Sequence, residues 1–402
     1  MMKKVPKRRF KGFLNAGDWE QCKFKDIAFK RGKISEADLP YVEFEDINSG
    51  IGTLNKNILQ KVGHKKGILF EAGDVLFGKL RPYLQNWLLC QFMGIAVGDF
   101  WVFQPQIVSS AFLYYLIQSE AYQSVVNISS GTKMPRSSWS LVSETHFSIP
   151  KYKEATMIGE FLTSIDKNIT LHQRKLEKLQ ATKKALLYEL FPIENSRRPK
   201  RRFKGFTGDW EQRKLEGLCD LFTDGDWIES KDQCGSGVRL IQTGNIGITE
   251  YLDKPDNKKW ISDETFNQLH CKEVFPGDIL ISRLPEPAGR ACIIPHLGTK
   301  MITAVDCTIV RTSTNTTASF LVQYLSSQPY FNEVNKCLAG GTRQRISRSA
   351  LAEFKVLVPS EKAEQDIIGK VFDKFDILIT LHQRKLEKLK NLKAAYLNEM
   401  FV

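Results

Sequence analysis

Two short basic loops carry the side chains of this sequence that are best suited to bind an anion or to read a nucleobase. One loop, "SGTKMPRSSW", begins at Ser130, and the other, "GGTRQRISRS", begins at Gly340. Arginine, lysine and amide side chains hydrogen-bond to base edges, and cations and hydroxyls bind phosphates. A basic loop is also an ordinary solvated surface, but this one recurs with Gly-Thr leading both copies. We therefore predict nucleic-acid contacts at Thr132, Lys133, Arg136, Thr342, Arg343, Gln344, Arg345 and Arg348.

A second set of basic residues ends two segments that resemble each other. "AGDVLFGKLRP" starts at Ala72 and "PGDILISRLPEP" at Pro276. In both segments Gly-Asp is suited to a turn, and the apolar residues after it predict a short buried strand. We predict that the cations at these strand ends also face the nucleic acid: Lys79, Arg81 and Arg283. Three aromatic residues are expected in the core, because duplex binding needs no exposed ring: Tyr83, Trp87 and Trp139.

A metal-dependent nuclease is the enzyme that the residue pattern leaves open. Asp306, Glu353 and Lys355 stand in an Asp…Glu-x-Lys order, in which two carboxylates hold Mg²⁺ beside a lysine. The first half has an incomplete version, with histidine in place of the lysine: Asp99, Glu144 and His146. Glu353 and Lys355 also fall in a predicted strand, so we do not favour catalysis. The sequence has no GxxxxGK[ST] phosphate loop and no glycine-rich strand–loop–helix for S-adenosylmethionine.

The bulk composition favours a protein with an acidic partner. The chain has 402 residues, a formal charge of +13 and a pI near 9.2, which favour nucleic acid. No apolar run approaches the roughly 20 residues of a membrane span, and "MMKKVPKRRFKGF" lacks the apolar core of a signal peptide. The eight cysteines form no CxxC pair, which predicts neither a disulfide framework nor a metal site. We expect a cytoplasmic protein without a cofactor of its own.

The chain is a tandem repeat of a globular unit followed by a helix. The eleven residues "ITLHQRKLEKL" occur at Ile169 and again, unchanged, at Ile379. Shorter matches precede them in the same order in both halves, including "KRRFKGF", "GDWEQ" and the strands and loops described above. This preserved order indicates a duplication. Strand-like segments such as "FWVFQP" and "FKVLVP" alternate with helix-like segments such as "SAFLYYLIQSEAYQSVV", so each globular unit is predicted to be mixed α/β.

The duplicated helix has the pattern of a coiled coil. Apolar residues recur every 3.5 residues over about four heptads in each copy, which predicts that the two helices pair along this seam. Polar residues interrupt the seam at the same places in both copies, and an antiparallel pairing would set His172 opposite Lys393 and Lys183 opposite His382. Two unrelated amphipathic helices, each packed on its own domain, are the alternative. The seam positions are Leu162, Ile165, Ile169, His172, Leu176, Leu179, Lys183, Leu186, Leu190, Phe372, Phe375, Ile379, His382, Leu386, Leu389, Lys393, Tyr396 and Met400.

Antiparallel helices would place the globular units at opposite ends of a rod. About 29 residues at about 1.5 Å per residue span roughly 43 Å. At about 3.4 Å per base pair this length corresponds to roughly 12–13 base pairs, near one turn of duplex. The pattern therefore predicts a device that measures the distance between two DNA half-sites.

This order of elements resembles the DNA-specificity subunits of type I restriction–modification systems, in which two target-recognition domains alternate with two near-identical helical regions. The resemblance covers essentially the whole chain and includes the tail "LHQRKLEKLKNLKAAYLNEMF". One departure is visible: "PSEKAEQDIIG" has the family's Pro…Glu-Gln…Ile start, whereas "PKYKEATMIG" lacks the glutamine after Glu154. The chain divides accordingly into a basic arm (1–17), domain 1 (18–150), a central spacer helix region (151–192), a basic linker (193–207), domain 2 (208–358) and a C-terminal spacer helix region (359–402).

The resemblance implies a non-catalytic subunit that reads a bipartite, asymmetric target in double-stranded DNA. Its helices would hold two methyltransferase (modification) subunits, through which restriction and translocase subunits join. S-adenosylmethionine, ATP and magnesium are then expected in the partner subunits, and adenine methylation is their product. We expect the linker around 197–206 to be an exposed connection that touches phosphates or only keeps the chain soluble. From the residues alone, a coiled-coil scaffold that does not bind DNA stays open.

Overall fold

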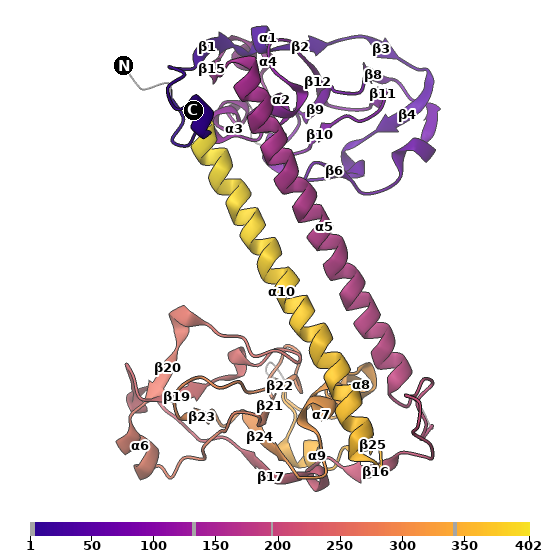
Figure 1. Ribbon diagram of the computed structural model, residues 1–402, viewed down its shortest axis with the longest axis vertical. Helices are drawn as coiled ribbons and strands as arrows, with labels where there is room; N and C mark the ends of the chain where they lie inside the picture. The colour runs from indigo at the N-terminus through magenta and orange to yellow at the C-terminus, as the bar shows by residue number, and fades with distance from the viewer. Residues whose placement is uncertain (1–4, 131–133, 194–195, 341–343) are drawn as a thin grey trace. The chain divides into compact units, whose positions relative to one another are not determined.

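The computed structural model describes residues 5–130, 134–193, 196–340 and 344–402. The chain forms two compact units, of which the first contains residues 1–173 and 384–402 and the second residues 174–383. Two long helices, α5 (Tyr152–Leu190) and α10 (Lys362–Met400), each contribute to both units (Figure 1). Each unit therefore contains one globular head, part of the helix that follows that head, and part of the other helix.

The first head is built on a four-stranded antiparallel sheet in the order β10-β9-β12-β2. Its strands are β10 (Trp87–Leu89), β9 (Val75–Gly78), β12 (Phe100–Pro105) and β2 (Ala28–Arg31). Successive side chains of a strand point to opposite faces, and here both faces are covered. Val75 and Phe77 pack among helices, while Leu76 packs toward a second sheet. The apolar run after Gly-Asp is continuous because neither face of β9 meets water.

The second sheet of this head has the order β3-β8-β11-β4-β7, and only the β11–β4 pair is parallel. Its strands are β3 (Ile34–Ser35), β8 (Gly67–Phe70), β11 (Gly94–Ala96), β4 (Asp38–Val42) and β7 (Val62–His64). Shorter pairs are β1 (Glu20–Lys23) with β15 (His146–Ile149), β13 (Ser129–Ser130) with β14 (Arg136–Ser137), and β5 (Ile47–Asn48) with β6 (Thr53–Leu54). The helices of the head are α1 (Phe24–Ile27), α2 (Ser110–Leu116), α3 (Glu120–Val126) and α4 (Trp139–Glu144).

The second head repeats this plan. Its antiparallel sheet has the order β17-β24-β21-β22, and its second sheet the order β18-β20-β19-β23 with β19 and β23 parallel. The strands are β16 (Glu211–Lys214), β17 (Cys219–Asp224), β18 (Gln233–Cys234), β19 (Val238–Ile241), β20 (Lys259–Ile261), β21 (Ile279–Ser282), β22 (Ala291–Ile293), β23 (Met301–Thr303), β24 (Cys307–Thr312) and β25 (Lys355–Val358). The helices are α6 (Asp263–Gln268), α7 (Ala318–Tyr324), α8 (Gln328–Lys336) and α9 (Arg348–Ala352). The predicted mixed α/β duplication is confirmed.

Each predicted helical run of a head is in fact two short helices. Ser119 begins α3 by accepting a hydrogen bond from the backbone N–H of Tyr122, and Ser327 begins α8 by accepting one from that of Tyr330. A serine at an N-cap accepts a hydrogen bond from a backbone N–H that has no partner within the new helix. The chain can therefore turn without leaving this N–H unpaired. The apolar spacing continued across both breaks, and therefore did not reveal them.

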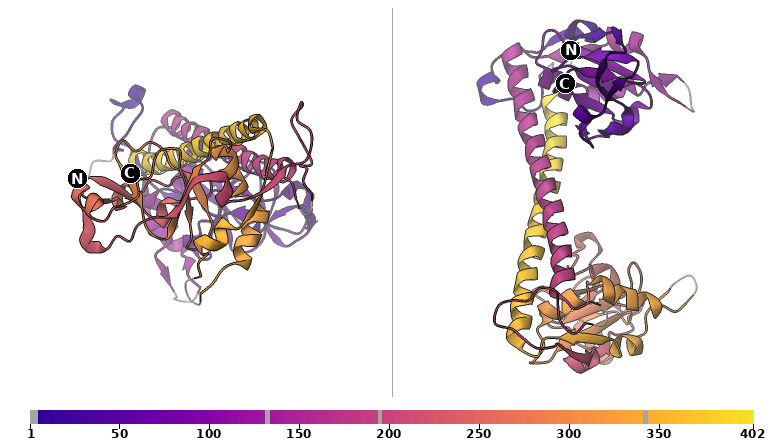
Figure 2. Two further views of the ribbon diagram at one scale, coloured as in Figure 1. Left: turned by 90° about the horizontal axis from the view of Figure 1, so that it is seen from below. Right: turned by 90° about the vertical axis from the view of Figure 1, so that its right-hand side faces the viewer.

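Within the first unit, the start of α5 packs antiparallel against the end of α10 (Figure 2). The rings of Phe161 and Tyr396 lie 4.8 Å apart, edge to face. Five residues further along α5, Asp166 contacts Lys393, which lies three residues earlier on α10. Met400 and Phe401 are buried in the same core as Leu162. The hydrophobic core of this head therefore contains the last residues of the chain.

Within the second unit, the end of α5 packs antiparallel against the start of α10. Lys183 lies 2.5 Å from Asp376, and the ring centroids of Phe191 and Phe372 lie 6.1 Å apart. Leu190, Phe191, Ile368 and Phe372 are buried in the core of the second head. All eighteen predicted seam positions are buried or half-buried. The helices are thus in contact along the predicted faces in each unit.

The polar positions of the seam have partners that the sequence analysis did not foresee. The Nζ atom of Lys393 lies 2.9 Å from Asp166, and that of Lys183 lies 2.5 Å from Asp376, so each lysine pairs with an aspartate. The prediction had set these lysines opposite His172 and His382. Each aspartate also accepts a hydrogen bond from its own head, from Tyr115 at 2.7 Å or Gln323 at 2.8 Å. Asp166 and Asp376 stand at the same place in the repeat, which was the signal that could have found them.

Candidate nucleic-acid interface

The Gly-Asp turns fix the direction of the strands β9 and β21, which end immediately before the predicted contact residues Lys79 and Arg283. Gly73 and Gly277 have φ of +92° and +96°, a backbone region in which side chains are strained. Asp74 accepts a hydrogen bond from the backbone N–H of Glu71 at 2.7 Å, and Asp278 accepts one from that of Phe275 at 2.8 Å. Arginines from other strands of the same sheets then pair with these buried carboxylates: Arg31 with Asp74 and Arg311 with Asp278. The strands β9 and β21 therefore begin from closed, charge-balanced turns.

In the first head, the end of β9 meets the basic loop that begins at Ser130. The backbone N–H of Ser137 donates to the carbonyl of Lys79 at 2.9 Å, and that of Arg81 donates to the carbonyl of Pro135 at 2.8 Å. Two predicted contact segments that are about fifty residues apart in sequence are thus joined by main-chain bonds. We call Lys79, Arg81, Asp99 and Arg136 the first rim.

Asp99 contacts two of the three cations of the first rim, Lys79 and Arg136. Its Oδ2 atom lies 2.9 Å from Nη2 and 3.3 Å from Nε of Arg136, and its Oδ1 atom lies 3.5 Å from Nζ of Lys79. Burial raises the pKa of Asp99, but the hydrogen bond from Arg136 and the charge of Lys79 outweigh it and leave the pKa below its usual value. Asp99 is therefore ionised at neutral pH. The sequence analysis had considered it only as part of a nuclease pattern.

A fourth cation, Lys30 on strand β2, lies next to the three cations of the first rim. Burial lowers the pKa of Lys30, and the positive charge of Lys79 lowers it further. The Lys30 ammonium also lies 4.5 Å from the ring centre of Trp139, which is a favourable cation–π distance. This side of the first head therefore carries more positive charge than Asp99 can balance.

The second head has the same backbone joint but a different set of side chains. The N–H of Ile346 donates to the carbonyl of Arg283 at 3.1 Å, and the N–H of Arg283 donates to the carbonyl of Asp306 at 2.9 Å. Arg345 is exposed, with Nη1 at 3.8 Å from Asp306. We call Arg283, Asp306 and Arg345 the second rim. Asp306 and Arg345 stand where Asp99 and Arg136 stand in the first head.

Arg283 points inward, unlike Lys79. Only 8% of it is exposed; Nη2 donates to the carbonyl of Val305 at 2.6 Å, and Nε lies 3.4 Å from Asp224. A guanidinium held in this way supports the turn from within and presents little charge to solvent. Asp224, on β17, was not considered in the sequence analysis, and no local motif identifies it.

The other residues for which the sequence analysis made a prediction differ in their solvent exposure. Arg81 is half-buried, with a left-handed φ of 50°, and Gln344 and Arg348 are exposed. Tyr83 is 57% exposed, so its assignment to the core is wrong, whereas Trp87 is buried and Trp139 half-buried. Four predicted residues lie outside the described part of the chain: Thr132, Lys133, Thr342 and Arg343.

The carboxylates of the nuclease pattern are engaged in ion pairs. Glu353 lies 2.7 Å from Lys214 and Asp306 lies 3.8 Å from Arg345. In the first head, Glu144 takes hydrogen bonds from Lys23 and Lys25, which lower its pKa to about 2. Among the described residues, no group of three or more His, Cys, Asp or Glu side chains is placed to hold a metal ion.

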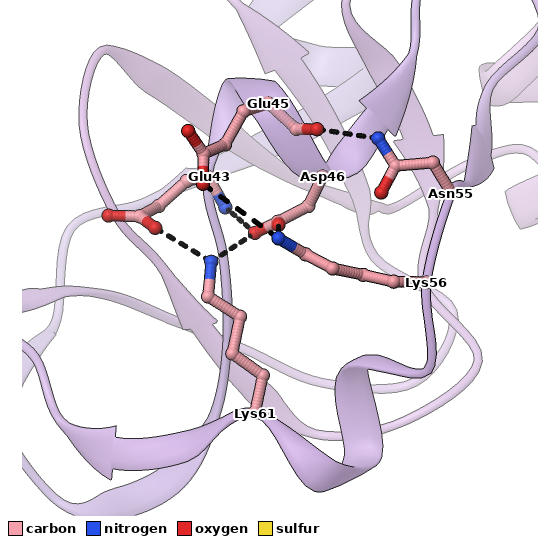
Figure 3. A network of polar contacts seen from close by, with 6 residues as sticks. All are labelled: Glu43, Glu45, Asp46, Asn55, Lys56 and Lys61. Atoms are coloured by element: carbon pink, nitrogen blue, oxygen red, sulfur yellow. Dashed lines mark hydrogen bonds and ion pairs between the residues drawn. The ribbon is translucent and has the colours of Figure 1, made fainter.

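A buried carboxylate closes the turn after β4 in the first head (Figure 3). Asp46 is fully buried and caps the backbone N–H of Glu43 at 2.8 Å, while Lys56 and Lys61 reach its two oxygens at 2.5 and 2.6 Å. Burial raises the pKa of Asp46, but the hydrogen bonds from the two lysines lower it by more than burial raises it. The net shift of the pKa is therefore downward. In the second head Asn245 makes the same cap, to the N–H of Gln242 at 3.0 Å. Sequence reasoning missed this network, because its residues show no spacing typical of a motif.

The basic arm and the basic linker are tied to the helices. Arg9 pairs with Glu154 at the start of α5 through Nε at 2.6 Å and Nη2 at 2.7 Å, and Arg202 pairs in the same way with Glu364 at the start of α10. Arg8 pairs with Glu399, and Arg201 with Glu189, at helix ends. These eight residues form equivalent clamps, which we call arm clamps. The duplicated "KRRFKGF" motif thus holds one helix start and one helix end in each unit. The sequence analysis expected only an exposed linker and did not predict this role.

The glutamine that distinguishes the two helix starts makes a specific contact. Gln365, which is almost fully buried, accepts from the backbone N–H of Thr317 at 3.0 Å and donates to the carbonyls of Asn315 and Pro359. Ala155 occupies the corresponding place in α5 and is buried among apolar residues. The departure noted in the sequence is therefore a local change at one helix start.

Comparison with known proteins bears on the whole chain. The model of the type I restriction modification DNA specificity domain matches residues 16–181 and again residues 207–391. The MjaVIII specificity subunit of a type I restriction enzyme from Methanocaldococcus jannaschii is similar, with 21% identity over 412 residues that cover 95% of this chain and 91% of that one. Among the described residues, no helix has the length and apolar character needed to cross a membrane.

Two solved structures are similar in fold. The S subunit of a type I restriction–modification system from M. genitalium matches with a TM-score of 0.64 and 13% identity, over 99% of both chains. A chain from a structure that concerns complex assembly and conformational transition of the type I R-M system matches with a TM-score of 0.50 and 19% identity, over 95% of this chain and 97% of that one. Each of the two matched segments contains one head, one rim and most of the long helix after it, and this chain therefore belongs to the family of type I restriction–modification DNA specificity subunits.

Proposed function

We propose that each head reads one half of a bipartite, asymmetric target in double-stranded DNA. The observation that carries this proposal is the pair of rims. Both place a loop arginine beside an aspartate and join the loop to the strand end by the same main-chain hydrogen bonds. The strand-end cation is half-buried beside that aspartate in the first rim, whereas in the second rim it points inward. Base readout depends on which side chains a scaffold presents. A common scaffold with unlike side chains suits two unlike half-sites.

As a specificity subunit, the chain is the non-catalytic component of a type I system. The nuclease interpretation and the interpretation as a scaffold without DNA are therefore both set aside. The chemistry would come from partners: modification subunits that use S-adenosylmethionine to methylate adenine, and restriction subunits that use ATP and Mg²⁺. This chain would determine the DNA sequence at which these partners act.

The helices would supply docking surfaces for two copies of the modification subunit. Within the identical stretch, the residues that point away from the seam are also identical, and they include exposed leucines, Leu171 at 48% and Leu381 at 56%. Exposed lysines recur in the same way, at Lys175 and Lys385. Packing in the seam cannot explain the identity of exposed side chains. Two equal surfaces for one kind of partner explain it.

Single-molecule methylome sequencing of cells with and without the gene tests the proposal. We expect a divided adenine-methylated motif that disappears with the gene. A methylation pattern that does not depend on the gene, or an undivided motif, would contradict the proposal. A stop codon placed before Glu353 removes β25 and α10 and is the control for loss of an intact subunit. This truncated variant should lose the methylated motif, as the deletion does.

The helices also provide a test of the proposed spacing function. Seven residues inserted at the same place of the repeat in both α5 and α10 add two turns, or about 10 Å, to each helix. We expect the gap in the methylated motif to lengthen by about three base pairs at about 3.4 Å each, with both halves unchanged. An unchanged gap, with the motif still methylated, would show that the helices do not set the distance.

A further inference from the structure

The guanidinium of Arg136 has one edge occupied and one edge free. Its Nε–H and one N–H of Nη2 both donate to Oδ2 of Asp99, at 3.3 and 2.9 Å. The edge formed by Nη1 and the second hydrogen of Nη2 makes no hydrogen bond to any described residue, and 54% of the side chain is exposed. The guanidinium is planar with donors in a fixed fork, so holding one edge also fixes the direction of the other.

The backbone under Arg136 is fixed as well. Arg136 lies in β14, which pairs with β13, and it also forms a bridge with Leu80. The neighbouring N–H of Ser137 donates to the carbonyl of Lys79. Both the main chain and the inner edge of this side chain are therefore positioned before any ligand arrives.

We propose that Arg136 reads a guanine of the first half-site through its free edge, and that Asp99 is the positioning residue that holds it for this purpose. The free edge of a guanidinium matches the O6 and N7 acceptors of guanine in the major groove. The inference rests on the proposed function, and deepens it by assigning one base contact.

The carboxylate distinguishes base reading from phosphate binding. Asp99 is ionised, since the nearby cations hold its pKa below the usual value. A fixed negative charge within 3 Å of the guanidinium repels a phosphate that approaches the same group, whereas the uncharged edge of a base is not repelled. Lys79, whose Nζ lies 3.5 Å from Asp99, is less constrained because a lysine ammonium is a point charge on a flexible stem.

The second head shows the same pairing in a looser form. Arg345 approaches Asp306 through Nη1 at 3.8 Å, which is too long for a hydrogen bond, and Arg345 is the more exposed arginine at 63%. One long contact fixes neither the plane nor the direction of the fork. Arg136 is therefore the arginine to test for strict base selection, and Arg345 is the comparison in the same protein.

The test uses the full subunit with its modification subunits, assayed on duplexes in which every base pair of the first half-site is replaced in turn. For Arg136→Ala we expect discrimination at a single G·C pair to fall about 10- to 100-fold, which corresponds to the roughly 1–3 kcal/mol of one bidentate pair. All other positions and the whole second half-site should keep their preferences. Asp99→Asn should relax the same position, and should also bind random duplex more tightly because a negative charge is gone. Asp99→Glu should restore part of the selectivity.

Lys66→Ala is the control, because Lys66 is an exposed cation of the same head whose ion pair is with Glu36. It should leave every base preference unchanged. If Arg136→Ala instead weakens all duplexes equally and reduces the salt dependence by about one unit, Arg136 contacts a phosphate and the inference is overturned. An unchanged Arg136→Ala profile also overturns it. In both of these cases a divided motif in the wild type leaves the proposed function standing, whereas no divided motif in the wild type refutes the function and the inference together.

Discussion

Asp46 and Asn245 make the same cap in the two heads with different charge. Asp46 needs two lysines to balance it, whereas Asn245 satisfies the N–H of Gln242 and the carbonyl of Leu252 without a cation. An ionised carboxylate with no exposed surface is costly unless it is paired. The first head should therefore depend on the ionisation of one residue, and the second should not.

We predict that Asp46→Asn lowers the free energy of unfolding of the first unit by about 2–3 kcal/mol at pH 7, because it removes two charge-assisted hydrogen bonds. The folded-state pKa of Asp46 is lowered, so its contribution is complete above the ordinary aspartate value of about 3.9 and is lost as the pH falls through the lowered value. The variant and the wild type should converge in strongly acidic solution. Urea unfolding of the full chain, followed by circular dichroism across this pH range, measures the difference.

Glu45→Gln is the matched control for this prediction. The side chain of Glu45 is 74% exposed and lies 3.8 Å from Lys56, so its ion pair is screened by solvent. It should change stability by less than about 0.5 kcal/mol. An Asp46→Asn variant as stable as this control at pH 7 would show that the buried network does not stabilise the head.

Single residues mark the limit of what the sequence could predict. The repeat aligned Lys79 with Arg283 and so suggested equal roles, but Arg283 turns inward to Asp224 and the carbonyl of Val305. Asp224 is distant in sequence and has no motif of its own. Tyr83 was expected in the core, yet it follows the left-handed Arg81 and points to solvent. Side-chain direction depends on tertiary neighbours, and residue type and spacing do not encode those neighbours.

At the scale of elements, the arm clamps connect segments that are far apart in sequence. Only 6% of the Arg9 side chain and 1% of the Glu154 side chain are exposed, and the two form a two-bond pair. The clamp at Arg202 and Glu364 repeats this geometry in the second unit. The duplicated motif was visible in the sequence, but its basic composition indicated a free surface, because the carboxylate partners of Arg9 and Arg202 lie more than a hundred residues away.

We predict that Arg9→Met destabilises the first unit by about 3–5 kcal/mol, because it leaves the buried charge of Glu154 without a partner. The double variant Arg9→Met, Glu154→Met should recover most of this loss of stability, because it leaves no buried charge without a partner. Thermal unfolding of the four proteins in the cycle measures both effects. Equal destabilisation in the single and double variants would mean that the charge pair is not the cause. Arg202→Met and Glu364→Met repeat the test in the second unit.

The main elements were more predictable than their contacts. The Gly-Asp turns, the strands after them and both long helices were predicted from local patterns, and all are present. Those signals lie within one stretch of chain, so they are readable. The aspartates that pair with Lys183 and Lys393 also recur in the repeat, but an apolar seam pattern does not reveal which polar residue a lysine will reach.

At the scale of the whole molecule, the excess of positive charge predicts how DNA affinity responds to salt. The formal charge is +13, and the first rim has three cations and one carboxylate. We predict that affinity for random duplex DNA falls by about 10³-fold or more between 50 and 200 mM salt, as for proteins that make about 6–10 phosphate contacts. Fluorescence anisotropy with random duplex, and elution from heparin, measure the slope. Affinity that does not change with salt would contradict a phosphate-binding surface.

One feature of the first unit affects how the protein is made. Its hydrophobic core includes Met400 and Phe401, which come after the whole second head in the sequence. A ribosome that has released the whole first head has not yet supplied the part that seals it. The core of the first head is therefore incomplete until α10 has been synthesised. Truncation of the chain before Met400 would then produce a defect in the region that was synthesised first.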